Sequence, residues 1–457
     1  MDASFIIADN AAGTKFSDLS GETVEATKRY VLDTIGAIIA GSSASGVREI
    51  LDQVLDWGGK EESTIIVYGK KVPAPHAALL NSVMAHAREL DDIHDRAHVH
   101  PSITIFPAVL ATAEAAGGIN GREFIVALAL GMDLACRMGL ATQKDTGWHW
   151  STNYGYMGAA LASGKILKLN AKEMHDALGI AYSMTGGTMQ NLADAAVMKR
   201  VQPGFSAKGG VISALLAKRG VTGCKGVREG KYGYYNLYKR GAYDRNELIQ
   251  DLGKRFEGIN ASIKLYPCCR CTHAAIDGMF ALLQRKDLNA VDVKGIEVIV
   301  PEHVFEVVGR PFEIRENPQV DAQFSIQYTV AATLIRKSLS LKDFEEAAVR
   351  DPEVMALAKK IKISVDHGIK GRPNVPATVK VEMKTGEHIA GTIDVMRGDP
   401  RNRLSWDELW TKIAGLRSYA VSAFPETRLT EIFQVVQKLD EVNDMRKLSR
   451  LCTAGGA

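Results

Sequence analysis

The segment from Glu89 to Pro101 holds the densest group of acid–base side chains in the chain. Its ionisable residues of interest are Glu89, Asp91, Asp92, His94, Asp95, His98 and His100. Carboxylates and imidazoles held close together shift one another's pKa values toward neutrality, which suits general acid and base catalysis. A catalytic site is therefore the favoured interpretation of this segment.

Two other interpretations of the same segment stay open. His94 and His98 are four residues apart, so they would share one face and bind a metal ion if the apolar helix before them continued that far. Alternatively, the segment is a solvated loop whose histidines only cap helix ends. The residue types alone do not separate these three interpretations.

Further along the chain, His149 lies between two tryptophans in GWHWSTNYG. An imidazole among aromatic rings can exchange a proton in a partly dry pocket, although a lone histidine more often has a structural partner. Lys199, Arg200 and Lys264 stand at the boundaries of predicted elements, where cations suit the recognition of carboxylates. The alternative for each lysine is an ordinary surface position.

Six cysteines in 457 residues are too few for a disulfide scaffold, so we expect reduced thiols. Three of them crowd together in CCRCTH, which also contains His273. Structural zinc normally needs a second pair of ligands, and no CxxC partner occurs elsewhere in the chain. We therefore expect no metal at this motif.

The elements that would position these side chains are mostly helices. From Gly21 to about Lys218, apolar residues recur with helical spacing in segments separated by Gly- or Pro-bearing breaks. The first segment, GETVEATKRYVLDTIGAIIAG, is predicted to end at a C′ glycine, Gly41. Several segments are rich in Ala, Gly and Ser, which lets helix backbones approach closely. We expect a tightly packed all-helical domain over residues 1–266.

After Pro267 the pattern changes. GIEVIVP, VKVEMK and HIAGTIDV alternate as strands do, and Thr385 and Gly386 between the last two predict a hairpin. Two short helical patterns, LKDFEEAAVR and EVMALAKKI, lie among the strands. The predicted fold class is mainly α, with a large all-helical domain and a smaller α+β domain over residues 267–400. Helices in residues 401–457 are expected to pack back onto the helical domain.

Composition and the absence of certain motifs exclude several classes of function. The formal net charge of +3, with basic and acidic residues interleaved, argues against a nucleic-acid or membrane-surface role. Apolar stretches are interrupted before they would span a bilayer, and no basic segment followed by an apolar run opens the chain, so we expect a cytoplasmic protein. The motifs GxGxxG, GxxxxGK[ST] and GxSxG are absent from the sequence, which disfavours hydride transfer, phosphoryl transfer from ATP and serine hydrolysis.

Several segments, taken in chain order, resemble the MmgE/PrpD family. They are HARELDDIHDRAHVHPSITIFPAVLATAEAAGG, GREFIVALALGMDLACRMG, GWHWSTNYGYMGAALASGKIL, MKRVQPGFSAKGGVISALLAKRGVTG, SIKLYPCCRCTHAAIDG and DAQFSIQYTVAATLI. An ordered series of this kind covers most of the chain and is more specific than any single motif.

The resemblance implies a large helical domain, a smaller α+β lid domain and a homodimer, with the site between the domains and with no organic cofactor or metal. It also implies a lyase for a small di- or tricarboxylate, in the first place a dehydratase of a citrate-like hydroxy acid. A decarboxylase of a cis-aconitate-like acid or an epimerase is the alternative within the family. The rivals from other classes are a non-catalytic carboxylate-binding protein and a metal-dependent hydrolase that uses His94, His98 and His100.

The resemblance also implies a role for each matching residue. The positions that match the family's motifs are Asp91, Asp92, His100, His149, Lys199, Lys264, His273 and Tyr328. The lysines, with Arg200, would bind carboxylates and stabilise an enolate-like intermediate. One of the first two histidines would move the proton while an aspartate fixes its tautomer. Tyr328 or His273 would protonate carbon or a departing hydroxyl group.

Two departures from the family pattern fall in these segments. Ile93 stands where some relatives have threonine, and the interval from Asp92 to His100 is one residue longer, with extra histidines at positions 94 and 98. After Lys199 and Arg200 the chain reads Val-Gln-Pro, where many relatives have a histidine two residues after the lysine. Because both changes fall among the predicted site residues, the family match does not by itself fix the substrate.

Overall fold

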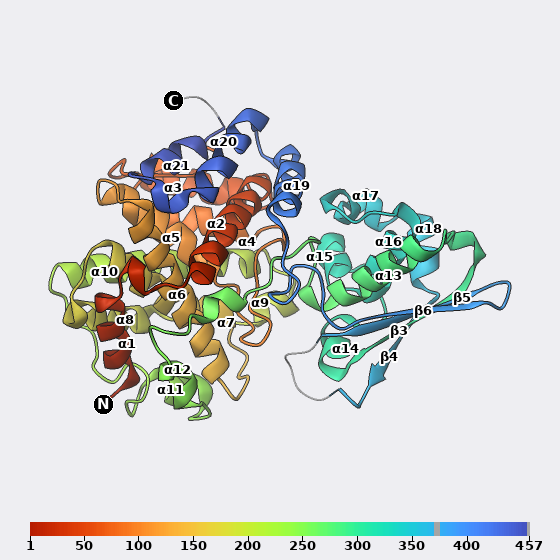
Figure 1. Cartoon of the computed structure of the whole chain (residues 1–457), viewed down its shortest axis with the longest axis horizontal. Coiled ribbons are helices and arrows are strands. Elements are labelled where there is room, and N and C mark those ends of the chain that lie inside the picture. Colours follow the sequence, from red (N-terminus) through yellow and green to blue (C-terminus); the bar gives the residue numbers. More distant parts are fainter. Residues whose placement is uncertain (370–374, 455–457) are drawn as a thin grey trace. The chain divides into compact units, whose positions relative to one another are not determined.

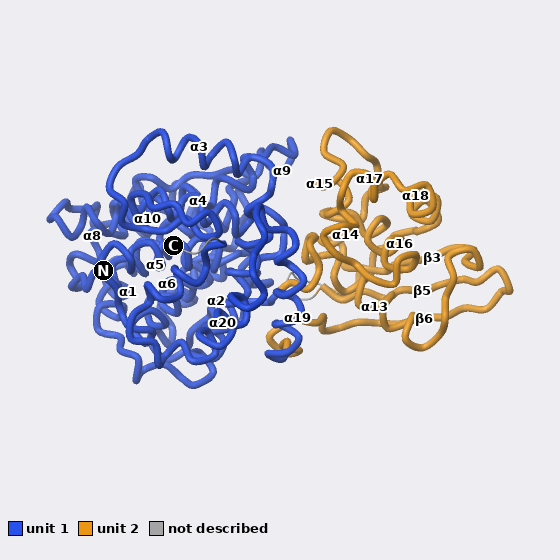
Figure 2. Tube along the Cα trace, turned by 90° about the horizontal axis from the view of Figure 1, so that it is seen from above, with its two compact units in different colours: residues 1–263, 405–457 blue, residues 264–404 orange. Residues whose placement is uncertain are grey.

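The computed structural model of the chain describes residues 1–369 and 375–454. By its internal contacts the chain divides into two compact units, which Figure 2 colours separately. The first unit comprises residues 1–263 and the chain from Ser405 onward, and the second comprises residues 264–404. The chain therefore leaves the first unit once and returns to it.

The first unit is helical apart from a short antiparallel ribbon of β1 (Ser63–Thr64) and β2 (Lys71–Val72). Its helices are α1 (Ala3–Gly13), α2 (Gly21–Gly41), α3 (Val47–Trp57), α4 (Ala74–His86), α5 (Ser102–Ala115), α6 (Gly121–Ala141), α7 (Trp150–Ile166), α8 (Ala171–Met184), α9 (Gln190–Ala193), α10 (Met198–Lys218), α11 (Tyr234–Lys239), α12 (Arg245–Ile249), α19 (Trp406–Leu416), α20 (Glu426–Gln437) and α21 (Arg446–Leu451). Helices α4, α5, α6, α7 and α10 pack against one another at its centre (Figure 1).

Glycines let the central helices approach closely, as the small-residue content predicts. A Cβ atom at Gly131 of α6 would lie 2.8 Å from the carbonyl oxygen of Gly158 on α7. At the end of α2, a Cβ atom on Gly41 would lie 1.9 Å from the carbonyl oxygen of Met84 on α4. The prediction of Gly41 as a C′ residue is wrong, because α2 includes it and Ser42 is the C-cap. Its glycine is needed for close packing instead.

Helix α6 is the longest apolar segment to compare with the expectation that small or charged residues interrupt every apolar stretch. By length and composition alone it could cross a membrane. However, 94% of its apolar window is buried inside the structure. Within that window, Asp133 and Arg137 form a buried ion pair at 2.8 Å, and Arg137 also donates to the Gln250 carbonyl oxygen. These are the properties of a core helix.

The helices after Ser405 belong to the first unit. On α19, Trp406 donates its indole N–H to the Glu25 carboxylate of α2 at 2.7 Å. Lys412, also on α19, pairs with the buried Asp33 of α2 and donates to the carbonyl oxygen of Leu90 at 3.1 Å. The returning chain thereby contacts the segment that the sequence singled out for chemistry.

The second unit is α+β. Its elements are α13 (His273–Arg285), β3 (Val293–Pro301), α14 (Glu302–Val308), α15 (Pro318–Gln323), α16 (Ile326–Arg336), α17 (Glu346–Val349), α18 (Pro352–Ala358), β4 (Ile361–Asp366), β5 (Ala377–Met383) and β6 (His388–Ile393). The sheet order is β4-β3-β5-β6, with β3 parallel to β4 and the other pairs antiparallel. Strands β5 and β6 form the predicted hairpin, with Gly386 at φ 85° in its turn.

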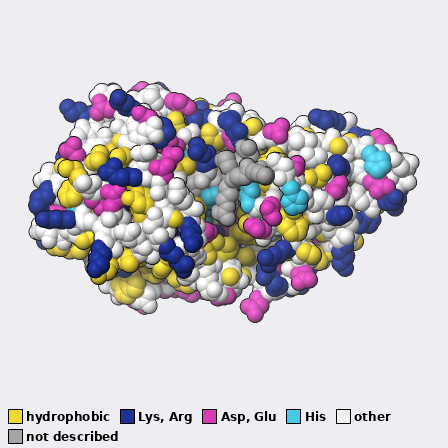
Figure 3. Space-filling view, turned by 90° about the horizontal axis from the view of Figure 1, so that it is seen from below, with side chains coloured by type: hydrophobic (Ala, Val, Ile, Leu, Met, Phe, Trp, Pro, Cys, Tyr) yellow, Lys and Arg dark blue, Asp and Glu magenta, His cyan; other side chains and the backbone are white. Residues whose placement is uncertain are grey.

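These two units confirm the predicted fold class, mainly α with a large helical part and a smaller α+β part. Their surfaces carry both signs of charge. On the face drawn in Figure 3, basic and acidic side chains are interspersed.

The close contact between α6 and α7 predicts the effect of one added methyl group. Gly131→Ala should lower the free energy of unfolding by about 1–3 kcal/mol, because the new Cβ atom overlaps the neighbouring backbone. The matched control is Gly415→Ala in α19, where nothing lies within 4 Å of the new atom. That change should stabilise the protein by about 0.5–1 kcal/mol. Chemical denaturation measures both, and equal effects would contradict the packing argument.

Candidate active site

The connection between α4 and α5, residues 87–101, buries its acidic side chains near the start. Glu89, Asp91 and Asp92 are between 1% and 3% exposed, so this segment is not a solvated loop. The first residues of three helices contact it, through the pairs Ser102 with Asp92, Ser151 with His100 and Lys199 with Glu89. Helix N-termini carry unpaired N–H groups and partial positive charge. They therefore provide a favourable setting for buried carboxylates.

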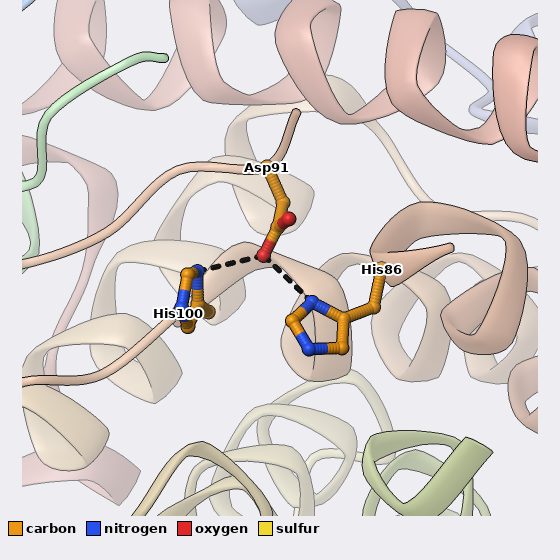
Figure 4. A group of neighbouring side chains, drawn as sticks. All are labelled: His86, Asp91 and His100. Atoms are coloured by element: carbon orange, nitrogen blue, oxygen red, sulfur yellow. Dashed lines mark hydrogen bonds and ion pairs between the residues drawn. The ribbon is translucent and has the colours of Figure 1, made fainter. Parts of the chain in front are cut away.

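The centre of this site is a carboxylate shared by two imidazoles (Figure 4). Asp91 Oδ2 lies 2.9 Å from Nδ1 of His86 and 2.7 Å from Nδ1 of His100. The side chains of His86 and Asp91 are almost completely buried, whereas that of His100 is 14% exposed. Within this group, His100 is therefore the member best placed to meet a ligand.

His86 was not among the predicted site residues. It is the last residue of α4, and its side chain points toward Asp91 (Figure 4). Burial, together with the nearby charge of Lys199, lowers the pKa of His86 to about 4, so its imidazole is neutral at pH 7. The signal available in the sequence was a histidine five residues before the aspartate pair.

Asp92 has a different environment from Asp91. Its carboxylate accepts from the backbone N–H of Ser102 at 3.2 Å, and the Ser102 hydroxyl lies 2.7 Å from its other oxygen. Burial, reinforced by the charges of Asp91 and Asp33, raises the pKa of Asp92 to about 8. Asp92 therefore carries a proton at pH 7.

The cations of α10 lie in its first turn. Lys199 pairs with the buried Glu89, and Arg200 is only 7% exposed. Glu89 adopts a left-handed φ of 55°, which is uncommon for a residue other than glycine. Such a conformation persists where the surroundings determine it, and it is frequent at functional sites. The Lys199 pair shows that the bend at Glu89 directs its carboxylate toward α10.

His149 is the N-cap residue of α7. Its Nδ1 accepts a hydrogen bond from the backbone N–H of Thr152 at 3.3 Å and lies 2.7 Å from the Thr152 hydroxyl oxygen. The centroid of its ring is 6.2 Å from that of His86. Burial and the charge of Lys199 hold the pKa of His149 well below its ordinary value. The structure therefore brings Asp91, Asp92, His100, His149, Lys199 and Arg200 into one region of the first unit.

The helical arrangement of His94 and His98 is wrong, because α4 ends at His86. Residues 94 and 99 form a β-bridge instead, and Nδ1 of His94 accepts from the Ala97 N–H at 3.1 Å. His98 packs edge-on against Trp150, with ring centroids 5.2 Å apart. Ile93 exchanges backbone hydrogen bonds with Ser262. The extra histidines therefore shape the loop, and they do not share a helix face on which a metal would bind.

The remaining predicted residues belong to the second unit. Lys264 is 1% exposed, and His273 begins α13 with its ring centroid 5.0 Å from that of Tyr266. Tyr328 lies in α16, where its hydroxyl donates to the Asp343 carbonyl oxygen and burial raises its pKa to about 12. In CCRCTH, Cys268 Sγ lies 3.1 Å from the Thr272 hydroxyl. The catalytic roles of Lys264, His273 and Tyr328 stay predictions.

His86, Asp91 and His100 also offer three ligand atoms within 4.8 Å of one another, which is enough to consider a metal ion. Two observations favour hydrogen bonds instead. The nitrogen to oxygen separations of 2.9 and 2.7 Å are those of charge-assisted hydrogen bonds. In addition, the ammonium group of Lys199 is close enough to depress the pKa of His86, and a positive charge there opposes a second cation.

A helical unit with a buried acid–base group, followed by an α+β unit, defines the class of this protein. The chain belongs to the MmgE/PrpD family, since the MmgE/PrpD N-terminal domain matches residues 6–245 and the C-terminal domain matches residues 266–438. The resemblance seen in the sequence is thereby confirmed.

Curated relatives align over almost their whole length. The cis-aconitate decarboxylase of Aspergillus terreus is 28% identical, with 96% of this chain and 94% of the relative aligned. The cis-aconitate decarboxylase-like protein oryM of Aspergillus oryzae is 30% identical, with the same coverage. The human cis-aconitate decarboxylase is 25% identical over 96% of this chain and 92% of its own length. These relatives support a lyase-family enzyme.

The raised pKa of Asp92 predicts how stability depends on pH. The folded state keeps the Asp92 proton up to about pH 8, whereas the unfolded state loses it near pH 3.8, so this group destabilises the fold as pH rises between those values. Asp92→Asn imitates the protonated acid. Its melting temperature should therefore fall less than that of the wild type between pH 6.5 and 8, a range above the titration of His86.

Asp52→Asn is the control for this measurement. Asp52 is exposed and pairs with Arg48 on the surface of α3, so its replacement should leave the pH dependence of the wild type unchanged. The same decline in wild type and Asp92→Asn would show that Asp92 is already ionised in the folded protein.

Proposed function

We propose that this protein is a cofactor-independent lyase for a small di- or tricarboxylate, and that decarboxylation of a cis-aconitate-like acid is its reaction. The observation that carries the proposal is the buried group of His86, Asp91 and His100 beside the cations Lys199 and Arg200. The names of the curated relatives favour decarboxylation over the dehydration that the sequence suggested first.

The cations have a clear task in such a reaction. Decarboxylation breaks a carbon–carbon bond, releases carbon dioxide and leaves an electron pair that a neighbouring carboxylate can accept as an enolate. Lys199, Arg200 and the N-termini of α5, α7 and α10 present positive charge where that anion would form. Preorganised positive charge in a dry site stabilises the developing anion more strongly than water does.

In the second step the enolate is protonated on carbon, which gives the product. His100 is the member of the His86, Asp91 and His100 group with exposed surface, and Asp91 beside it stabilises the imidazolium form that gives the proton. Solvent restores that proton after each turnover. The same residues could act in the reverse direction, with His100 as the base that removes a proton beside a carboxylate. Dehydration of a citrate-like acid requires such a step. Dehydration is therefore the second candidate.

The reaction is tested with a panel of acids. Purified protein incubated in D₂O with cis-aconitate should release carbon dioxide and give a product with one deuterium on carbon. Proton NMR follows the loss of cis-aconitate and the formation of this product. Added EDTA should leave the rate unchanged. Turnover of 2-methylcitrate or citrate alone would transfer the proposal to dehydration, and inertness toward the whole panel by folded protein would leave the non-catalytic carboxylate-binding protein.

The role of Asp91 is tested by Asp91→Asn. The amide cannot stabilise the imidazolium of His100 as a carboxylate does. Because both imidazoles meet the same oxygen, the amide presents to both rings either an uncharged oxygen or its NH₂ group. We expect kcat to fall by about 10²–10⁴-fold. Circular dichroism should confirm the fold, and Asp9→Asn on the exposed side of α1 is the matched control with unchanged kcat. Full activity of Asp91→Asn would remove Asp91 from the mechanism.

A further inference from the structure

The three imidazoles of the site are all held through Nδ1, but their partners differ in kind. His100 and His86 meet carboxylate or carbonyl oxygens, whereas His149 meets the backbone amide of Thr152 and the hydroxyl of the same residue, which can either donate or accept. Because a neutral imidazole has one N–H group and one lone pair, the partner of Nδ1 decides which of them Nε2 offers to a ligand.

His100 is the most constrained of the three. Its Nδ1 lies 2.7 Å from Asp91 Oδ2 and also 2.7 Å from the backbone carbonyl oxygen of Asp92. A carbonyl oxygen only accepts hydrogen bonds, so Nδ1 must carry the hydrogen. In the neutral ring, Nε2 of His100 therefore has the lone pair.

His86 is held in the same way, by the same carboxylate oxygen of Asp91. Its Nδ1 lies 2.9 Å from Oδ2 of Asp91, the same oxygen that accepts from Nδ1 of His100, and we assign the hydrogen to Nδ1 of His86 in the same way. Within the part of the chain that the structure describes, Nε2 of His86 is buried and has no hydrogen-bond partner. His86 acts on His100 through Asp91, which makes it a positioning residue.

His149 is held in the opposite sense. The backbone N–H of Thr152 points at its Nδ1 over 3.3 Å, and a backbone amide nitrogen can only donate. Nδ1 of His149 must then be the acceptor, as expected of an N-cap side chain that satisfies an unpaired N–H of the first turn of α7. The hydrogen of the neutral ring is consequently on Nε2.

We propose that the site holds its histidines in two opposite neutral tautomers, with His86 and His100 protonated on Nδ1 and His149 on Nε2. It follows that His100 moves the proton, whereas His149 donates a fixed hydrogen bond to the negative charge that develops on the substrate. The tautomers stand on geometry alone, and the division of roles rests on the proposed lyase function.

The chemistry of the two tautomers supports this division. His100 can take up or release a proton at Nε2 because Asp91 stabilises its charged form. His149 stays neutral, since burial and the Lys199 charge oppose its protonation. A neutral imidazole N–H is a very weak acid, but it is a good hydrogen-bond donor to an enolate oxygen. The sequence could not distinguish these two roles.

The tautomers can be measured without any substrate. In protein labelled with ¹⁵N-histidine, long-range ¹H–¹⁵N spectra at pH 7 identify the protonated nitrogen of each ring, and the variants His86→Gln, His100→Gln and His149→Gln assign the signals. We expect a protonated Nε2 for His149 and a protonated Nδ1 for His86 and His100. A His149 ring protonated on Nδ1, or on both nitrogens, would overturn the proposal.

The division of roles is tested by paired amides. In His149→Gln the new NH₂ group lies near the former Nε2 position and keeps a donor, so kcat should stay within about 10-fold of the wild type. In His149→Asn that donor is lost, and kcat should fall by about 10²–10³-fold. Neither amide can transfer a proton, so His100→Gln and His100→Asn should both lose about 10²–10⁴-fold.

Equal loss in His149→Gln and His149→Asn, with the fold intact by circular dichroism, would mean that His149 itself transfers the proton. The two experiments separate the two proposals. The expected tautomers in a protein that turns over none of the acids would leave the assignment standing and remove the lyase function. Turnover with the wrong tautomers would do the reverse.

Discussion

One oxygen atom, Oδ2 of Asp91, accepts from the imidazoles of His86 and His100, and contacts of the surrounding residues hold it in that position. A buried carboxylate is costly unless its hydrogen bonds are made, so the backbone around it must be fixed. Lys412 binds the carbonyl oxygen of Leu90 just before it, and Ile93 is bridged to Ser262 just after it. Hydrogen bonds from segments far apart in the sequence therefore fix the backbone before and after Asp91.

The acidic side chains around this carboxylate are accommodated in two ways. Glu89 forms an ion pair with Lys199, and Asp33 forms one with Lys412 from the returning C-terminal helices. Among the residues that the structure describes, the hydrogen-bond partner of the Asp92 carboxyl group is Ser102 and not a cation. Burial keeps this carboxyl group protonated instead. Several acids can therefore be buried together because only some of them are charged.

Periodicity was sufficient to predict the fold class, because a helical core and a small sheet leave different patterns of apolar residues. The hairpin of β5 and β6 followed from its turn residues, and the close helix contacts followed from the small side chains. The pattern also predicted α6 as a helix, but composition alone does not separate a core helix from a membrane helix, and only its burial in the folded chain identifies it as a core helix. The pattern misjudged Gly41, whose purpose is a contact with α4 that only the folded chain shows.

The site was predicted in its residue types but not in its geometry. His86 was missed because no glycine or proline marks the end of α4; the chain turns at Glu89, which takes a left-handed conformation without the residue that normally signals it. The placement of His149 beside His86 depends on packing between helices that are distant in sequence. The protonation states of Asp92 and of the site histidines could not be predicted from the sequence either, since they follow from burial and from hydrogen-bond partners.

The residues proposed to move the proton and the cations proposed to bind the substrate come from separate elements. His86, Asp91 and His100 lie at the end of α4 and in the connection to α5, while Lys199 and Arg200 lie in the first turn of α10. The Val-Gln-Pro sequence that departs from many relatives follows those cations directly. If Lys199 and Arg200 hold the substrate as proposed, a substitution in α10 alters which acid is held, while the hydrogen bonds of Asp91 come from other elements of the chain and persist.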